Sequence, residues 1–367
     1  MSKILFVVSS PGTVKSFLLP FINKLSEEHE IHVAANFSDN ILFEFKDLIF
    51  AMHDIEIVRN PSVFSDFNSL IKLIRIIKKE NYDIVHTFTP KAGLLGQLAA
   101  FFCMTSKRFH TYTGQVWVTT KGVKRGLLKL FDKTIGTLAT FSLVDSPSQR
   151  QFLIDNNVIR EHKSAVLGNG SISGVNTEKY SFSPEKRIHC RQKLGLNEDS
   201  VLLLYAGRLK YDKGIPELVR AFREVCLENT FLAIVGVDED NLLPLIENEK
   251  NIIFCGYSKN IINYYCASDL LCLPSHREGF GNVIIEAASS GLPALASNIY
   301  GLSDAVEHGE TGLLHKVKDV EDIKSKLIRL ISDKEHLKLL GKNAHERAMR
   351  DFNEAHVVNE LVEFYQK

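Results

Sequence analysis

Two glutamates eight positions apart frame a glycine-rich turn in the second half of the chain. The segment reads Pro274-Ser-His-Arg-Glu278-Gly-Phe-Gly-Asn-Val-Ile-Ile-Glu286. It follows a short apolar run and opens a helical pattern near Asn282, so the first amides of that helix, those of Gly281, Asn282 and Val283, are expected to bind a phosphate. The carboxylates would then suit hydroxyl groups on either side of the phosphate. By spacing alone they could equally be a solvated and a capping glutamate, and the Gly-Phe-Gly turn between them favours the site.

Two cations stand in an earlier loop of the same kind. The loop reads Gly207-Arg208-Leu-Lys-Tyr-Asp-Lys213-Gly214 and separates an apolar run over 201–206 from a helical pattern over 215–225. The planar fork of Arg208 and the point charge of Lys213 complement a diphosphate. Either cation alone is more often a solvated surface charge, but together with the helix amides they predict one convergent anion site.

Short β-rich runs alternate with amphipathic segments along the whole chain, which predicts βαβ units and parallel sheets. The expected strands span 3–9, 30–36, 54–59, 83–88, 108–113, 141–146, 165–168, 201–206, 231–235, 252–255, 270–274 and 294–297. The pattern pauses near residue 180, so we expect two doubly wound α/β domains facing a cleft. Such sheets bind ligands beyond the carboxyl ends of their strands, which is where both loops lie.

The composition is that of an ordinary globular protein. The 367 residues include 45% hydrophobic and 24% charged side chains, which excludes disordered, collagen-like and disulfide-scaffold classes. The 44 basic residues balance 44 acidic ones, which argues against a nucleic-acid partner. Six cysteines without a Cys-x-x-Cys pair predict neither a disulfide framework nor a zinc site. No apolar run approaches the length of a membrane span, so a cytoplasmic protein is expected, at most peripheral on the inner membrane.

Three motifs in order resemble the family-4 retaining glycosyltransferases of GT-B fold. They are the Glu-x7-Glu element, the Gly-Arg…Lys-Gly loop and Gly309-Glu-Thr-Gly-Leu-Leu. The resemblance implies an acceptor-binding domain over 1–180, a nucleotide-sugar-binding domain over 181–345, and a C-terminal helix over 346–367 that crosses back to the first domain. It implies that Arg208 and Lys213 hold the donor diphosphate and that Glu286 binds the ribose.

The same resemblance assigns further roles. Glu278 would bind the transferred sugar, the Phe280–Val283 backbone would hold sugar and phosphate, and Gly256-Tyr-Ser would lie beside the base. Gly12 matches a flexible turn near the diphosphate, although Pro11 precedes it in place of a second glycine. His110, expected at a strand end facing the cleft, matches the active-site histidine. A lone histidine is more often structural, and the family match favours the catalytic role.

Two features of the first half point to the acceptor side. Lys91 opens a helix in His86-Thr-Phe-Thr-Pro-Lys and would meet an acceptor phosphate, with a solvated first-turn lysine as the equal alternative. Residues 101–150 carry eight cations against Asp132 and Asp145, with Trp117, Val118, Leu127 and Leu128 interleaved. This pattern predicts that residues 117–133 dock on an anionic membrane surface, unless they form only a solvated helix face.

The sequence therefore predicts a retaining glycosyltransferase that moves a hexose or N-acetylhexosamine from a nucleotide-diphosphate sugar, with UDP as the default base. The acceptor implied by the resemblance is a lipid-linked or polysaccharide intermediate of a bacterial surface glycan. No nicotinamide cofactor is expected, since Gly-x-Gly-x-x-Gly is absent after the first strand. No metal is expected either, because neither a cluster of Asp, Glu and His nor an Asp-x-Asp triplet is identified. A GT-B sugar-nucleotide 2-epimerase and a non-catalytic nucleotide-sugar-binding module are the alternatives.

Overall fold

Two separate parallel sheets organise the chain in the computed structural model, which describes residues 1–37, 49–58, 62–225, 227–247 and 249–366. The first unit comprises Met1–Ser173 together with His356–Lys367, and the second comprises Gly174–Ala355. The sequence analysis set these limits at residues 180 and 345. In place of one C-terminal helix over 346–367, two helices occur, α14 (Lys334–Asp351) and α15 (Glu354–Gln366).

The first unit is built on a seven-stranded sheet. Its strands are β1 (Lys3–Val7), β2 (Glu30–Ala35), β3 (Ala51–Asp54), β4 (Ile84–Phe88), β5 (Lys107–Tyr112), β6 (Phe141–Val144) and β7 (Ser164–Val166). They are all parallel, in the order β3-β2-β1-β4-β5-β6-β7. Ile4 of β1 pairs with Ile31 on one side and Ile84 on the other, so the first strand is central.

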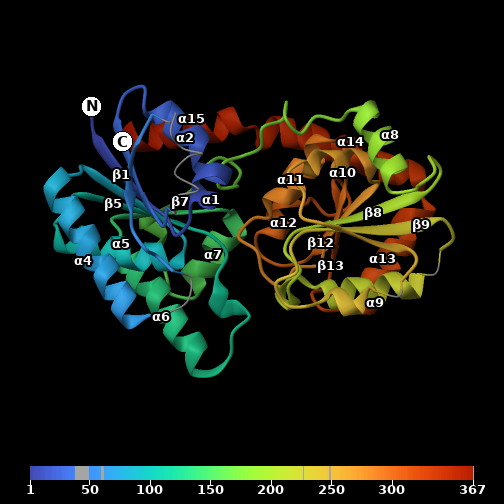
Figure 1. Ribbon diagram of the computed structural model, residues 1–367, viewed down its shortest axis with the longest axis horizontal. Coiled ribbons are helices and arrows are strands. Elements are labelled where there is room, and N and C mark those ends of the chain that lie inside the picture. Colours follow the sequence, from blue (N-terminus) through green and yellow to red (C-terminus); the bar gives the residue numbers. More distant parts are fainter. Residues whose placement is uncertain (38–48, 59–61, 226, 248, 367) are drawn as a thin grey trace. The chain divides into compact units, whose positions relative to one another are not determined.

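Helices cover both faces of this sheet (Figure 1). Its helical segments are α1 (Pro11–Thr13), the π-helical η1 (Val14–Leu18), α2 (Leu19–Leu25), α4 (Val63–Glu80), α5 (Pro90–Phe102), η3 (Val116–Val118), α6 (Gly122–Leu138), α7 (Pro147–Asp155), η4 (Glu161–Lys163) and α15. Ile4 and Phe6 face α2 and α15, whereas Leu5 and Val7 face α4 and α5. An uncharged strand buried on both faces is what this doubly wound arrangement requires.

The second unit is built on a six-stranded parallel sheet in the order β10-β9-β8-β11-β12-β13. Its strands are β8 (Val201–Ala206), β9 (Thr230–Val235), β10 (Ile252–Gly256), β11 (Leu270–Leu273), β12 (Ala294–Ser297) and β13 (Gly312–His315). Its other segments are α8 (Pro184–Lys193), η5 (Tyr211–Lys213), α9 (Ile215–Val225), η6 (Leu243–Leu245), α10 (Ile261–Ala267), α11 (Asn282–Ser289), α12 (Leu302–Ala305), α13 (Val320–Ser332) and α14. Figure 1 shows α9 and α13 below this sheet and α8, α10, α11 and α14 above it. Each unit is therefore a doubly wound α/β sheet, and the predicted fold class is confirmed.

One predicted strand is displaced and one strand was not predicted, whereas the other predicted strands agree with the structure to within two residues at each end. The strand expected over 54–59 lies at β3, Ala51–Asp54. Ile55 and Ile57 are buried although they follow the strand. Their apolar alternation is typical of a strand, but here the two side chains pack into the core from an irregular segment. The edge strand β13 was not predicted at all, because Gly312–His315 was interpreted only as part of a motif.

Candidate functional site

The order of strands in the second sheet brings the two predicted anion-binding loops together. β8 and β11 are neighbours at the point where the chain reverses its direction of winding. The loop over 207–214 follows β8 and the loop over 274–281 follows β11. In open α/β sheets this switch point is where the crevice for a ligand forms.

Lys213 and Glu278 meet across this switch point. The Lys213 ammonium forms an ion pair with Glu278 Oε1, and the Ser275 hydroxyl donates to the same oxygen at 2.9 Å. A second pair, Arg277 with Asp212 at 2.9 Å, also joins the two loops. The predicted diphosphate cation and the predicted sugar carboxylate therefore neutralise one another in this structure.

A left-handed glycine begins α11 beside this pair. Gly281 is the N-cap with φ of 89°. The turn before it lies against Gly301, where a Cβ atom would come 2.3 Å from the Gly279 carbonyl oxygen. Phe280 is buried with its ring 5.1 Å from that of Phe352, so only its backbone is placed to contact a ligand. The turn thus presents backbone at the start of a helix, as an anion site requires.

Glu286 lies one turn into α11 and is half-buried. The Tyr265 hydroxyl, from α10, donates to Glu286 Oε2 at 2.8 Å. Burial raises the pKa of the Glu286 carboxyl, while the hydrogen bond from Tyr265 opposes that rise. Tyr265 was not predicted, because nothing in the sequence spacing places α10 against α11.

Arg208 has a partner that the sequence analysis overlooked. Its guanidinium contacts both oxygens of Glu239 at 3.1 Å, and Lys210 pairs with Asp240 at 3.1 Å. Asp238-Glu239-Asp240, shortly after β9, is an Asp-x-Asp triplet, so the expectation that the sequence has no such triplet is wrong. Asp238 accepts the amides of Leu242 and Leu243, so all three carboxylates have partners within the protein. Among the described residues no group of three His, Cys, Asp or Glu side chains is placed to hold a metal.

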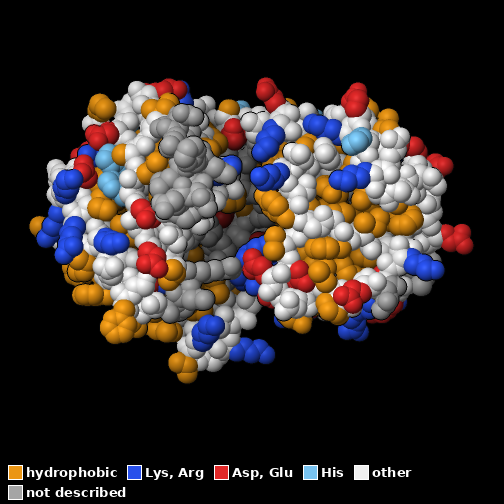
Figure 2. Space-filling view, in the orientation of Figure 1, with side chains coloured by type: hydrophobic (Ala, Val, Ile, Leu, Met, Phe, Trp, Pro, Cys, Tyr) orange, Lys and Arg blue, Asp and Glu red, His pale blue; other side chains and the backbone are white. Residues whose placement is uncertain are grey.

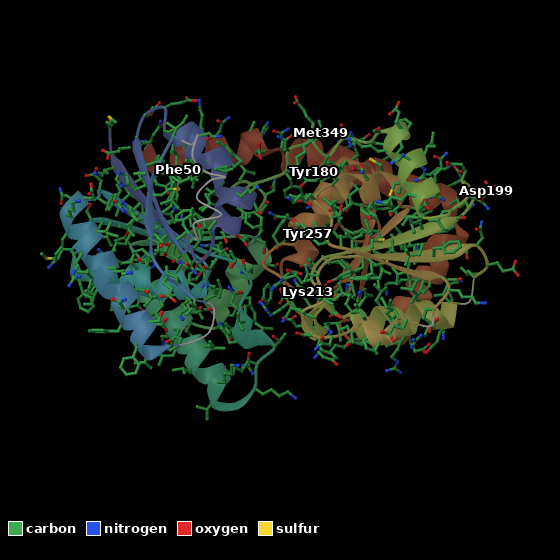
Figure 3. All side chains as sticks on the ribbon, viewed as in Figure 1. Phe50, Tyr180, Asp199, Lys213, Tyr257 and Met349 are labelled. Carbon is green, nitrogen blue, oxygen red and sulfur yellow. The ribbon has the colours of Figure 1, made fainter. Side chains whose placement is uncertain are left out.

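Lys213 and Tyr257, both expected near the donor, lie on the same side of the second unit. Figure 3 shows them on that side, together with Tyr180, and Asp199 on the opposite one. Tyr257, predicted beside the base, follows β10 and is largely exposed. Asp199 precedes β8, so the two sides are the two ends of the parallel strands.

The first sheet has its own switch point, between β1 and β4. The Ser9 and Thr89 hydroxyls, one from the loop after each strand, lie 2.7 Å apart. Thr89 has φ of 65°, a strained conformation for a β-branched residue, and it caps α5. Lys91, the second residue of α5, pairs with Asp66 at 2.6 Å. Gly12, expected in a flexible loop, instead lies in the first turn of helix α1 with room for a Cβ atom.

The structure differs from the expected position of His110. β5 continues for two residues beyond it, and its ring is 1% exposed. Thr87 Oγ1 lies 2.7 Å from its Nδ1, and a Cβ atom on Gly93 would come 2.5 Å from its Cε1. Burial lowers the pKa of His110 to about 3. The ring is therefore a neutral group inside the first unit, and the catalytic role expected for His110 stays a prediction.

Trp117 is also interior rather than part of a surface. Its Nε1 donates to Asp132 at 2.8 Å and its ring stacks on Phe152.

The five cysteines within the described ranges are free, and Cys226 lies outside them. Within the same ranges no helix has the length and hydropathy to cross a bilayer.

Comparisons with known proteins agree with this architecture. Residues 186–347 match the family described as glycosyl transferases group 1, and residues 3–131 match glycosyl transferase 4-like. The capsular polysaccharide biosynthesis glycosyltransferase CapM of Staphylococcus aureus is 34% identical over 322 residues, covering 85% of this chain and 84% of that protein. A UDP-Gal:alpha-D-GlcNAc-diphosphoundecaprenol alpha-1,3-galactosyltransferase of Escherichia coli is 28% identical over 93% of this chain and 89% of its own.

Solved structures show the same fold. Anabaena Alr3699/HepE, crystallised in complex with UDP and glucose, superposes with a TM-score of 0.82 at 19% identity, over 100% of both chains. WaaG, a glycosyltransferase involved in lipopolysaccharide biosynthesis, superposes with a TM-score of 0.76 over 99% of both chains. With the two doubly wound sheets and the CapM relationship over most of both chains, the protein belongs to the group 1 (family 4) glycosyltransferases of GT-B fold.

Proposed function

We propose that this glycosyltransferase moves a hexose or N-acetylhexosamine from a UDP-sugar to a lipid-linked or polysaccharide acceptor of a bacterial surface glycan, with retention of configuration. The observation that carries the proposal is the meeting of Lys213, Glu278 and the start of α11 at the switch point of the second sheet. The names of the Escherichia coli relative and of the UDP-bound Anabaena structure support the choice of base. The Escherichia coli relative also supports a diphosphate-linked lipid as acceptor.

Donor binding would exchange one ion pair for another. A diphosphate placed before α11 brings two negative charges beside Lys213, which then turns from Glu278 to the phosphate. Glu278 is released to accept hydrogen bonds from hydroxyl groups of the sugar. Arg208, held by Glu239, is exposed enough to add its charge, and Glu286 accepts the ribose hydroxyls with Tyr265 fixing its orientation.

The transfer step needs no protein nucleophile. The bond between the anomeric carbon and the diphosphate oxygen breaks, and the acceptor hydroxyl oxygen bonds to that carbon from the same face. The hydroxyl proton passes to the departing phosphate oxygen. Charge that develops on the diphosphate is stabilised by Arg208, Lys213 and the amides that begin α11, which together supply what a metal supplies in other transferases.

The first unit would bind the acceptor at its own switch point. Ser9 and Thr89 offer two hydroxyl groups there, and α5 begins directly beyond Thr89. Lys91 is already paired with Asp66, so an acceptor phosphate would have to share or replace that carboxylate. We therefore assign Lys91 a charge-balancing role toward the acceptor.

A thermal-shift series with UDP, GDP, ADP and TDP, with and without EDTA, tests the donor site. Binding to the folded state raises the melting temperature by mass action, so UDP should give the largest shift in wild type. That shift should disappear in Lys213→Met and Glu286→Gln. It should persist in Arg220→Ala, an exposed cation elsewhere on the second unit. No shift with any nucleotide would contradict the proposal.

Product analysis separates transfer from epimerisation. We expect no change of the UDP-sugar in the absence of acceptor, beyond slow hydrolysis. Accumulation of a C2-epimer without acceptor would instead identify a sugar-nucleotide 2-epimerase.

A further inference from the structure

The first half of α6 extends beyond the body of the first unit. Toward its C-terminal end the helix is anchored, since the Asp132 carbonyl accepts the Tyr112 hydroxyl at 2.6 Å and Ile135 is fully buried. The helix runs antiparallel to the strands, because it leads from the end of β5 to the start of β6. Nine residues before Asp132, a distance of about 14 Å along the helix axis, Val123 is 91% exposed. Leu127 and Leu130 share its face and are exposed too.

The first turn of α4 extends past the same edge of the sheet. The Ser69 hydroxyl donates to the Glu56 carbonyl just after β3, so the residues before Ser69 lie beyond the carboxyl ends of the strands. There Phe64 is 91% and Phe67 65% exposed. Helix α5 lies between α4 and α6 and contacts both. Figure 2 shows hydrophobic and basic side chains gathered along the lower edge of this unit.

The exposed charges of residues 121–133 have one sign, and Asp66 in the first turn of α4 is paired with Lys91. Lys121, Lys124, Arg125 and Lys133 are exposed, and none of them forms an ion pair within the described part of the chain. The acid of the same segment, Asp132, is buried against Trp117, and burial raises its pKa to about 6. Exposed cations without an ion-pair partner, beside exposed aromatic and aliphatic side chains, suit an interface that is both anionic and apolar.

We infer that the first turn of α4 and residues 121–133 form a docking surface for an anionic lipid bilayer. A second copy of the chain would bring like charges together, so it is disfavoured as the occupant. This docking surface differs from the predicted one over 117–133 in two ways. It excludes Trp117, which is interior, and it includes the first turn of α4, which contributes the aromatic side chains. The inference rests on the proposed function only in that a lipid-linked acceptor would then reach Ser9 and Thr89 from the membrane, at the same edge of the sheet.

Vesicle co-sedimentation of the full chain tests the docking surface without donor or acceptor. Phosphatidylcholine vesicles with phosphatidylglycerol should bind the protein, and phosphatidylcholine alone should bind it far less. Each cation near such a surface contributes about fivefold to partitioning, so Lys124→Ala/Arg125→Ala should lose about 25-fold. Phe64→Ser/Phe67→Ser should also lose binding while the UDP-induced thermal shift is kept. Lys338→Ala/Leu339→Ser, exposed on α14, is the matched control and should bind as wild type does.

Equal binding to neutral and anionic vesicles, or an equal loss in the α14 control, would overturn the inference. Binding of a short oligonucleotide in preference to anionic vesicles would assign the surface to nucleic acid instead. The two proposals fail separately. Loss of transfer with docking retained contradicts the proposed function alone, and transfer to a soluble acceptor without docking contradicts this inference alone.

Discussion

Replacing His110 with glutamine should remove part of the acid sensitivity of the first unit. In the folded protein burial lowers the pKa of His110 to about 3, whereas an unfolded chain protonates a histidine near 6.5. Between these two values the unfolded state binds the extra proton, so stability falls as the pH falls. About pH 5 lies about 1.5 units below the pKa of the unfolded state, which corresponds to a loss of about 2 kcal/mol in the free energy of unfolding. Between about pH 7.5 and pH 5, the free energy of unfolding should therefore fall by about 2 kcal/mol less in His110→Gln than in wild type.

The single tryptophan of the chain makes this measurable in the first unit alone. Trp117 is buried between Asp132 and Phe152, so its fluorescence follows the unfolding of this unit in urea. His86 is buried as well, and its pKa is lowered by the same cause, so both wild type and variant keep its share of the acid sensitivity. His162→Gln, at an exposed position of the same unit, is the control. If His110→Gln and wild type lose the same stability toward acid, His110 is protonated in the folded state and its assignment as an interior residue is wrong.

Three further substitutions test the second unit. Lys213→Met should weaken UDP binding at least about tenfold in isothermal titration, because a charge-assisted hydrogen bond to phosphate is lost; unchanged affinity would remove Lys213 from the donor site. Tyr265→Phe should weaken UDP binding by up to about tenfold and make it fall further as the pH is lowered, since the carboxylate of α11 loses the donor that favours its charged form. A flat pH profile would contradict that role. Gly301→Ala should lower the melting temperature of the second unit by several degrees, because its Cβ atom would meet the Gly279 carbonyl at 2.3 Å. Gly309→Ala, with a similar φ and nothing within 4 Å, should cost clearly less, and equal losses would show that the backbone angle alone decides.

The strands that carry the site were predictable from sequence because they are buried on both faces. β8 and β12 were predicted at their observed ends, since uncharged runs between polar loops leave few alternatives. Two of the four edge strands were not: β13 was missed, and β3 was displaced because the apolar alternation of Ile55 and Ile57 serves packing beyond its end. A helix start preceded by Gly-x-Gly could likewise be predicted from the sequence, because this signal lies within a few consecutive residues.

The partners of the site residues were beyond the reach of sequence patterns. Glu239 meets Arg208 only because β8 and β9 are neighbours, although an acidic run directly after a predicted strand was a signal that could have been used. Tyr265 contacts Glu286 because of how α10 packs, and the spacing of residues along the sequence does not predict that packing. The burial of His110 was also beyond the reach of sequence patterns. A motif match suggested a reacting group, whereas its burial depends on Gly93 and Thr87, residues in other elements.

The split composition of the first unit constrains the order in which the molecule can be made. Val357, Leu361 and Tyr365 complete the core above β1, and the Tyr365 hydroxyl hydrogen-bonds His86. These residues are synthesised only after all 182 residues from Gly174 to Ala355. Until then one apolar face of the first unit is open and His86 has Thr111 as a partner but not Tyr365, whereas every segment of the second unit has already been synthesised. The core of the first unit can therefore close only after the chain of the second unit has been made, so an apolar face stays exposed during that part of synthesis.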